Sequence, residues 1–235
     1  MSGKLYLIPT TLGDCPINSC IPEFIKDIIN SIDYYIVENE RTARRYLRKL
    51  NIKTPIDNLK FYVLNKYTSP AEFNSFLKPI FINKDMGLIS EAGSPGVADP
   101  GAEVVKLAHM ENIRVIPLVG PSSILLALMA SGLNGQNFAF AGYLPIKRYE
   151  RISKIKFLEN LSKKENQTQI FMEAPYRNQN LLEDIVNACN SDTHLCLATD
   201  ITLKTECIKT KTMKEWKKEL PSINKRPTIF LLHKY

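Results

Sequence analysis

The sequence contains a series of short apolar runs that do not alternate with polar residues. In the first half of the chain these runs lie at residues 5–8, 34–37, 61–64, 86–89 and 114–119. A strand that is apolar on both faces is typical of a parallel sheet, because helices cover both sides of it. Stretches with helical spacing of apolar residues, such as 21–32, separate the runs. The first half therefore predicts a parallel α/β sheet.

The second half has a different pattern of elements. Strands are expected at 138–143, 169–173, 194–200, 206–210 and 228–233, and helices at 150–161, 179–188 and 213–219. Five strands with three helices leave too few crossovers for a wholly parallel sheet, so we expect a mixed sheet with antiparallel pairs. We therefore predict two α/β domains, at 1–119 and 120–235.

Charge and glycine content support this division. Residues 1–144 carry a net charge of +1 and residues 145–235 a net charge of +6, while all ten glycines lie at or before Gly142. A basic excess of this kind can meet phosphate groups, although a lysine-rich surface exposed to solvent explains it equally well.

Composition excludes several classes of protein. A chain of 235 residues, 44% hydrophobic and 23% charged, can bury a core and is not disordered as a whole. Five scattered cysteines without a C-x-x-C pair argue against a disulfide framework and indicate a reducing compartment, and three distant histidines argue against a metal centre. Residues 115–146 carry no charge, but Pro117, Gly120 and Pro121 interrupt them, so we expect buried core and no membrane span.

The strongest local signal is the glycine- and proline-rich stretch at residues 90–101. It follows a predicted strand and leads into a helix that begins at Asp99 and Pro100, so it lies where α/β proteins bind ligands. Gly93 and Gly96 allow a ligand to approach the backbone closely. The glycine spacing fits neither the dinucleotide fingerprint nor a phosphate-binding P-loop. By itself the stretch is also explained by a tight turn and a helix cap.

Two further strand exits have the same design. Residues 120–123, Gly-Pro-Ser-Ser, follow the fifth strand. Residues 7–13 contain the end of the first strand and the loop after it. Parallel strands end at one edge of their sheet, so three loops of this kind are expected to line a common cleft.

These segments occur in a familiar order. Residues 5–10, the Ser-Glu-Ala-Gly-Ser-Pro-Gly loop, Gly-Pro-Ser-Ser at 120–123, Gly-Tyr-Leu-Pro at 142–145 and Glu-Ala-Pro-Tyr-Arg at 173–177 together resemble the tetrapyrrole methylase superfamily. Within it they resemble the ribosomal small-subunit RNA ribose 2′-O-methyltransferases. The resemblance implies a cytoplasmic homodimer of two α/β domains that acts on RNA. It also implies that the cofactor, S-adenosylmethionine, is held folded in the cleft between the domains.

The resemblance also implies roles for individual residues. The expected substrate-binding residues are Arg41, Lys147, Arg148 and Arg151, and the candidate catalytic residues are Glu173, Arg177 and Glu38. The residues expected to bind the cofactor come from the loops and from three later positions: Pro9, Glu91, Gly93, Ser94, Val97, Ser122, Ser123, Leu144, Met172 and Pro227.

Several positions depart from the RNA-methylating pattern. Glu91 stands where aspartate is usual, Tyr67-Thr68 where His-Asn is usual, and Tyr176 where histidine is usual. Glu173 and Glu38 can therefore also be structural partners of nearby arginines, and the basic residues can be solvated surface. Two alternative functions stay open: methylation of a small molecule such as a tetrapyrrole, and a non-catalytic descendant that binds the cofactor.

Overall fold

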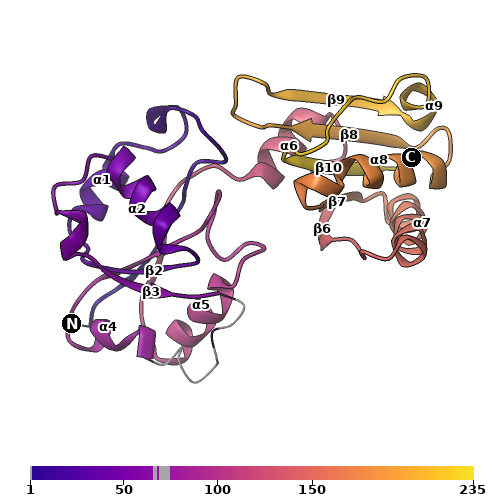
Figure 1. The fold of residues 1–235 in the computed structure, drawn as a ribbon. Coiled ribbons are helices and arrows are strands. Elements are labelled where there is room, and N and C mark those ends of the chain that lie inside the picture. Colours follow the sequence, from indigo (N-terminus) through magenta and orange to yellow (C-terminus); the bar gives the residue numbers. More distant parts are fainter. Residues whose placement is uncertain (1, 66–67, 69–74) are drawn as a thin grey trace. The chain divides into compact units, whose positions relative to one another are not determined.

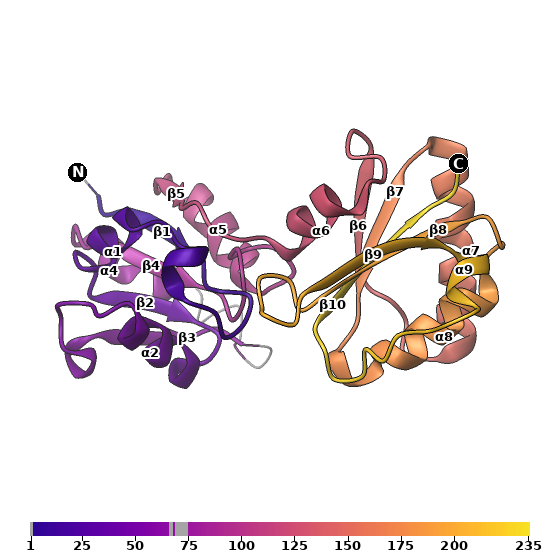
Figure 2. The same cartoon turned by 90° about the horizontal axis from the view of Figure 1, so that it is seen from above.

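The computed structural model describes residues 2–65, 68 and 75–235. The chain divides into two compact units, Met1–Ser122 and Ser123–Tyr235, compared with the boundary after residue 119 expected from the sequence. Each unit contains one five-stranded sheet (Figures 1 and 2). They are called here the N-terminal unit and the C-terminal unit.

The sheet of the N-terminal unit is wholly parallel, as predicted. Its strand order is β3-β2-β4-β1-β5, and all neighbouring strands in this order are parallel. The strands are β1 (Leu5–Ile8), β2 (Tyr34–Val37), β3 (Lys60–Val63), β4 (Met86–Ile89) and β5 (Val115–Pro117). The carboxyl ends of β2, β4, β1 and β5 therefore lie beside one another in this order.

Helices cover both faces of this sheet, which explains why its strands are apolar without alternation. Helices α1 (Phe24–Ile29) and α2 (Glu40–Lys49) lie on one face and α4 (Lys78–Phe81) and α5 (Gly101–Met110) on the other (Figure 1). In β2, Tyr35 packs in the core cluster with α1 and α2, while its neighbour Ile36 packs in the cluster with α4 and α5. Successive strand residues point to opposite faces, and here both faces are buried.

The sheet of the C-terminal unit is mixed, which confirms the prediction. Its order is β6-β7-β10-β8-β9, in which β6 and β7 are parallel and the other pairs are antiparallel. The strands are β6 (Phe138–Tyr143), β7 (Thr168–Met172), β8 (His194–Thr199), β9 (Cys207–Thr212) and β10 (Thr228–His233), and the helices are α6 (Ser123–Ser131), α7 (Arg148–Glu165), α8 (Asn178–Ala188) and α9 (Met213–Trp216).

The uncharged stretch at 115–146 forms β5, α6, β6 and their connections. In the part of the chain that the structure describes, no helix combines the length and apolar character that a membrane crossing needs. Helix α7 begins at Arg148, two residues before the predicted start, and ends at Glu165, where the next residue, Asn166, caps it in a left-handed conformation with φ 46°. The earlier start places both Arg148 and Arg151 in its first turn.

A buried carboxylate joins α7 to α8. Asp184 on α8 accepts hydrogen bonds from Arg148 Nε at 2.9 Å and from Arg151 Nη2 at 2.5 Å, and a further bond links Arg151 Nη1 to the carbonyl of Ile146. The side chains of Asp184 and Arg151 are both nearly inaccessible to solvent. These charges orient the start of α7, and the loop before it, against α8.

Asp184→Ala is predicted to destabilise the C-terminal unit by about 3 kcal/mol, because it leaves the buried Arg151 guanidinium without its counter-charge. Urea unfolding followed by tryptophan fluorescence measures this unit selectively, since the single tryptophan, Trp216, is buried in it. The matched control is Glu183→Ala, at the exposed neighbouring position. Equal stability of the two variants would contradict a structural role for the ion pair.

Candidate functional site

The candidate site of the N-terminal unit lies at the carboxyl edge of its parallel sheet. Strands β4, β1 and β5 are adjacent, and the three glycine- and proline-containing loops leave their carboxyl ends. The sequence prediction that these loops share one edge is therefore confirmed. Ligands of open α/β sheets bind at this kind of edge.

Hydrogen bonds tie the loop after β1 to the loop after β4. The backbone N–H of Thr10 donates to the carbonyl of Gly93 at 2.9 Å, and the Thr10 hydroxyl donates to the carbonyl of Ser90 at 3.3 Å. The Ser90 hydroxyl also donates to the Gly93 carbonyl, at 2.7 Å. Thr10 and Ser90 are both buried, so these bonds are shielded from water.

The loop after β5 closes against the other two. The Ser94 hydroxyl donates to the carbonyl of Pro121 at 3.3 Å. A Cβ at Gly120 would lie 2.2 Å from Cβ of Pro9, so that position admits no side chain. Gly93 has a φ of +72°, and a Cβ there would lie 3.0 Å from Leu12 Cδ2 and 3.1 Å from the Pro121 oxygen. Glycine is therefore needed at both positions for the three loops to meet.

Carboxylates stiffen the same edge. Asp99 accepts hydrogen bonds from the backbone N–H of Gly96 at 2.9 Å and of Gly101 at 2.7 Å, which fixes the loop before α5. Burial raises the pKa of Asp99. Burial also raises the pKa of Glu38, at the end of β2, and the nearby charges of Asp99 and Glu91 raise it further.

Glu91, the departure from the usual aspartate, reaches toward α2. Its Oε1 accepts a hydrogen bond from the Thr42 hydroxyl at 2.5 Å. Asn39 caps the start of the same helix, with its side chain accepting from the N–H of Arg41 at 2.9 Å. Tyr46, one turn further along, donates to the carbonyl of Pro9 at 2.7 Å. Helix α2 is thus bonded to two of the three loops, a role for Thr42 and Tyr46 that the sequence did not indicate.

The groups left accessible at this edge are of mixed chemistry. Glu91 is exposed, Val97 is 50% exposed, and Ser122 and Ser123 are half-buried. Pro9 is buried, and Ser94 is half-buried. An accessible carboxylate, an apolar side chain and hydroxyls beside glycine backbone suit a ligand that has a cationic amino acid end, ribose hydroxyls and an apolar ring. S-adenosylmethionine is such a ligand, so the residues present fit it.

The C-terminal unit has a candidate edge of its own. Tyr143 at the end of β6 pairs with Met172 at the end of β7, and Met172 pairs with Ile229 near the start of β10. Leu144 and Pro227, which adjoin these strands, therefore lie at the same edge as Met172. Leu144 is only 3% exposed and belongs to the core cluster of the unit, so its side chain is mainly structural.

The next residue after Met172 is the candidate catalytic glutamate. Glu173 is buried, and its Oε1 accepts hydrogen bonds from Arg177 Nη2 at 2.5 Å and from the backbone N–H of Ala174 at 2.7 Å. Its Oε2 has no hydrogen-bond partner among the described residues. Arg177 also bonds the Tyr176 hydroxyl and lies over the Tyr176 ring. The sequence prediction of a Glu173–Arg177 pair is confirmed in geometry, and its role stays a prediction.

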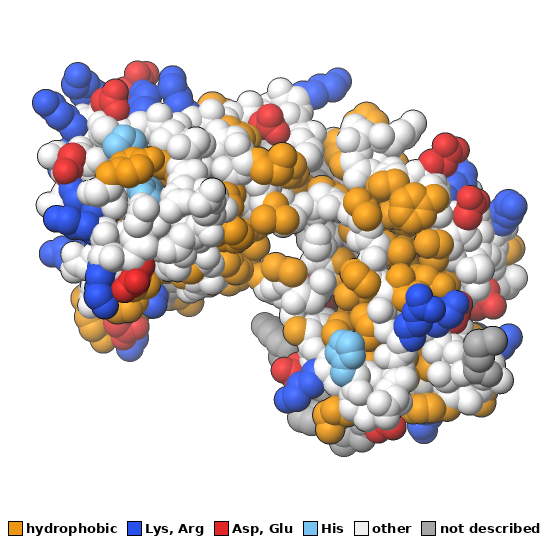
Figure 3. Space-filling view, turned by 180° about the vertical axis from the view of Figure 1, so that it is seen from behind, with side chains coloured by type: hydrophobic (Ala, Val, Ile, Leu, Met, Phe, Trp, Pro, Cys, Tyr) orange, Lys and Arg blue, Asp and Glu red, His pale blue; other side chains and the backbone are white. Residues whose placement is uncertain are grey.

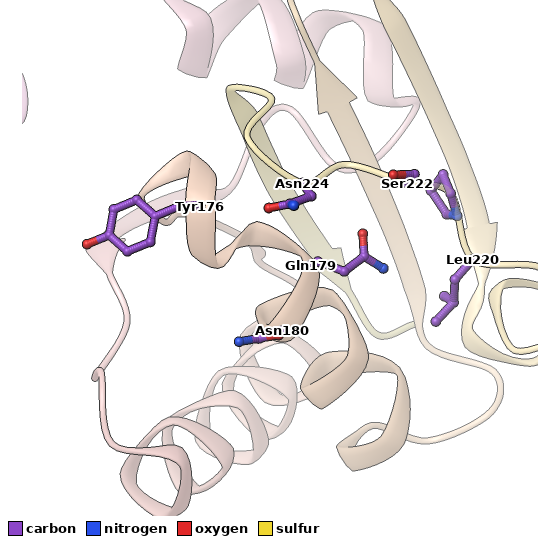
Figure 4. Close-up of a pocket in the computed structure, with 7 residues that line it drawn as sticks. Tyr176, Gln179, Asn180, Leu220, Ser222 and Asn224 are labelled. Atoms are coloured by element: carbon purple, nitrogen blue, oxygen red, sulfur yellow. The ribbon is translucent and has the colours of Figure 1, made fainter.

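Tyr176, which Arg177 contacts, is one of the residues that line a surface cavity of about 440 Å³ (Figure 4). It is formed between the start of α8 and the segment that precedes β10. Gln179 is held in place there, because its Oε1 accepts from the N–H of Ile223 at 3.1 Å. Most of the side chains that line the cavity are polar, namely Tyr176, Gln179, Asn180, Ser222 and Asn224. Leu220 and Pro221 are its apolar lining residues.

The predicted substrate-binding residues differ in accessibility. Arg41 is exposed on α2, and the Lys147 and Arg148 side chains are 71% and 72% exposed. Arg151 does not match its prediction as a cation offered to a substrate, since it is buried in the ion pair with Asp184. Lys and Arg side chains follow one margin of the C-terminal unit (Figure 3). Tyr67, singled out in the sequence, lies outside the described residues.

Comparison with solved structures defines the class of fold. The methyltransferase CobJ superposes with a TM-score of 0.65 over 99% of this chain and 95% of its own, at 14% sequence identity. Cobalt precorrin-4 methyltransferase, CbiF, gives a TM-score of 0.61 over 98% and 94%, at 15% identity. The chain has the fold of the tetrapyrrole methylases, as the resemblance of its motifs implied.

Comparison with curated sequences defines the family. The chain is 31% identical over 220 residues to ribosomal RNA small subunit methyltransferase I of Buchnera aphidicola subsp. Acyrthosiphon pisum, covering 92% of this chain and 74% of the relative. The enzyme of the same name from Vibrio cholerae is 29% identical over 98% of this chain and 77% of its own. A scan of protein-family profiles finds no match. The chain belongs to the ribosomal RNA small subunit methyltransferase I family, and it is a methyltransferase that uses S-adenosylmethionine.

Glu38→Gln is predicted to stabilise the protein at pH 7 more than at pH 4. The pKa of Glu38 is raised in the folded state, so the folded protein binds the carboxyl proton more tightly than the unfolded chain does. The stability of the fold therefore falls as the pH rises from the unfolded-state pKa through the folded-state pKa. The amide removes the charge and this cost with it. Thermal unfolding by circular dichroism at both pH values measures the difference. The control is Glu103→Gln, at an exposed position on α5. A benefit that is equal at pH 4 and pH 7 would rule out the charge as its cause.

Proposed function

We propose that this protein transfers the methyl group of S-adenosylmethionine to a ribose hydroxyl of ribosomal RNA. The observation that carries the proposal is the edge where Thr10, Gly93 and Pro121 join three strand-exit loops into one surface. That surface is stiff, made largely of backbone, and bordered by an accessible carboxylate. Its residues match the motifs shared with methyltransferases of this fold.

The proposed cofactor residues on the N-terminal unit are Pro9, Glu91, Gly93, Ser94, Val97 and Ser122, and Ser123 is the first residue of the C-terminal unit. Glu91 is accessible for the amino or ribose groups of the cofactor, whereas Gly93 is buried and is proposed to act by shaping the loop. Contributions from Leu144, Met172 and Pro227, and a position of the cofactor between the two units, stay predictions. When bound, S-adenosylmethionine supplies an activated methyl group on a sulfonium, so the protein has mainly to position the acceptor.

Relatives named ribosomal RNA small subunit methyltransferase I support RNA as the acceptor. The enzymes CobJ and CbiF share the fold at 14–15% identity, so they bear on the fold alone and do not favour a tetrapyrrole acceptor. A ribose hydroxyl must lose its proton as its oxygen bonds to the methyl carbon. Glu173 is the proposed acceptor of that proton, because Oε2 is unpaired while Arg177 and the backbone hold Oε1.

The cavity lined by Tyr176 suits a nucleic acid. It presents the amides of Asn180 and Asn224, which can bond base edges, and Tyr176, 64% exposed, can stack on a base. Lys147 and Arg148 precede and begin α7 and are accessible to phosphates, as is Arg41 on α2. Arg151 is not included, because its side chain is buried in the ion pair with Asp184, whereas Arg148, which bonds the same carboxylate, stays largely exposed.

We also propose that the protein acts as a homodimer in the cytoplasm. Strand β6 is an edge strand of its sheet, with Phe138 and Tyr143 exposed along it, and Met129 on α6 is 78% exposed. An apolar edge strand is a surface that a second copy can cover. A ribosomal acceptor is made and assembled in the cytoplasm. Light scattering of the purified protein tests the dimer.

Gly93→Ala is predicted to weaken S-adenosylmethionine binding at least about tenfold, because the methyl group would press on Leu12 and Pro121 and separate the loops. Isothermal titration calorimetry measures the affinity. The matched control is Gly132→Ala, which has a similar φ of +69° but no atom within 4 Å of the added carbon. If both variants bind the cofactor like the parent, the loop edge is not the cofactor site.

Glu173→Gln is predicted to lower kcat for methylation of ribosomal RNA by about 100-fold with little change in KM, since the amide cannot accept the hydroxyl proton. The assay uses labelled S-adenosylmethionine and small-subunit RNA that lacks its native methyl groups. Glu183→Gln, exposed on α8, is the control. Parent protein that binds the cofactor but methylates no RNA would refute RNA as acceptor, and an active Glu173→Gln variant would refute only the role of Glu173.

A further inference from the structure

Two cysteines that are separated in sequence by four residues meet in the segment between β1 and α1. Cys15 Sγ and Cys20 Sγ lie 3.4 Å apart, and both side chains are half-buried. Their spacing matches no familiar redox or metal motif, so the sequence did not indicate the pair. A short 3-10 turn at Ile17–Ser19 folds the segment back on itself and brings the two thiols together.

The other three cysteines belong to the C-terminal unit: Cys189 and Cys196 are buried there, and Cys207 is exposed on β9. A disulfide bond is about 2.05 Å long, so the two sulfurs need to approach by little more than 1 Å to bond. The intervening residues are held by local hydrogen bonds, which include Ser19 to the Pro16 carbonyl at 2.6 Å.

The cysteine segment is physically connected to the loop edge. Leu12, three residues before Cys15, is the side chain that lies against Gly93. Asp14 forms an ion pair with Lys49 on α2 at 2.5 Å, and Tyr46 of the same helix bonds the Pro9 carbonyl. A movement of Cys15 toward Cys20 is therefore transmitted to residues that pack on the loop after β4.

We propose that Cys15 and Cys20 form a peroxide-sensitive dithiol site, and that its disulfide weakens cofactor binding by displacing Leu12 from Gly93. The second part rests on the function proposed above. In the reaction with hydrogen peroxide, the Cys15 thiolate attacks one peroxide oxygen and forms a sulfenic acid, while the other oxygen leaves as hydroxide and becomes water. Cys20 sulfur then attacks Cys15 sulfur, and the displaced hydroxide leaves as water with the Cys20 proton. Overall two thiols are oxidised and one peroxide is reduced to two waters.

Cys15 is assigned as the thiol that reacts first. Burial raises the pKa of Cys20, and its contact with Cys15 raises it further, so little of Cys20 is thiolate at neutral pH. Cys20 is then suited to resolve the sulfenic acid, because it already lies in contact with the Cys15 sulfur. This order of events predicts that Cys20→Ser accumulates a trappable sulfenic acid on Cys15, whereas Cys15→Ser does not form one at Cys20.

The experiment uses the full chain carrying Cys207→Ser, which removes the exposed thiol without touching the pair. After mild treatment with hydrogen peroxide, mass spectrometry of the intact protein and of its peptides should show the loss of two hydrogens and a Cys15–Cys20 cross-link. Dithiothreitol should reverse both changes. The oxidised protein should melt at least about 5 °C higher, because the cross-link restricts the unfolded chain.

Cofactor affinity is the second measurement. Oxidation should weaken S-adenosylmethionine binding about three- to tenfold in calorimetry, and peroxide should leave the affinity of Cys15→Ser and Cys20→Ser unchanged. Absence of the cross-link under these conditions overturns the dithiol site. A cross-linked protein that binds like the reduced one overturns the coupling. Reduced protein that does not bind the cofactor at all counts against the proposed function, and the cross-link measurement still decides the dithiol site.

Discussion

The hydrogen bond from the Thr10 N–H to the Gly93 carbonyl is the contact on which the loop edge of the N-terminal unit depends. It joins the exits of two neighbouring parallel strands, and the left-handed conformation of Gly93 brings the third loop close enough for Ser94 to bond Pro121. Burial of Thr10 and Ser90 protects these bonds from competition with water. These bonds hold the three loops together, which suits the proposed cofactor site, because the main task of such a site in methyl transfer is to hold two groups in line.

In the C-terminal unit, two ion pairs involve α8 and the turn before it. Asp184 within α8 pairs with two arginines of α7, while Arg177, immediately before α8, holds one oxygen of Glu173. The pairing of Asp184 with Arg151 is buried on both sides. The second leaves Glu173 Oε2 without a partner among the described residues, at the edge where β6 and β7 end. An unpaired buried carboxylate oxygen is costly to maintain, and such costs are characteristic of sites that bind or react.

The fold shows the structural class of the protein, whereas the sequence shows the family to which it belongs. The fold is shared with the methyltransferases CobJ and CbiF at 14–15% identity, and a shared fold does not decide the acceptor. The family membership rests on sequence, at about 30% identity over most of the chain. The departures from the RNA-methylating pattern lie at defined places. Glu91 retains a carboxylate and uses its added length to reach Thr42, and Tyr176 retains an aromatic ring beside Arg177. Both substitutions are accommodated by local contacts without a change of fold.

The sequence by itself determined the two-part α/β architecture, the parallel and mixed sheets, and the three loops of the candidate site. These features follow from local rules: apolar runs, helical spacing, and the backbone freedom of glycine. The tertiary structure alone decided which charged side chains are accessible to a ligand and which are buried in ion pairs. Arg151 reads as a surface cation in the sequence, but a carboxylate 33 residues away on another helix buries and neutralises it. Likewise the proximity of Cys15 and Cys20, and the bonds of Thr42 and Tyr46 to the loops, depend on how segments pack in space. Periodicity reports which face of an element is buried; it carries no information about which distant side chain meets it.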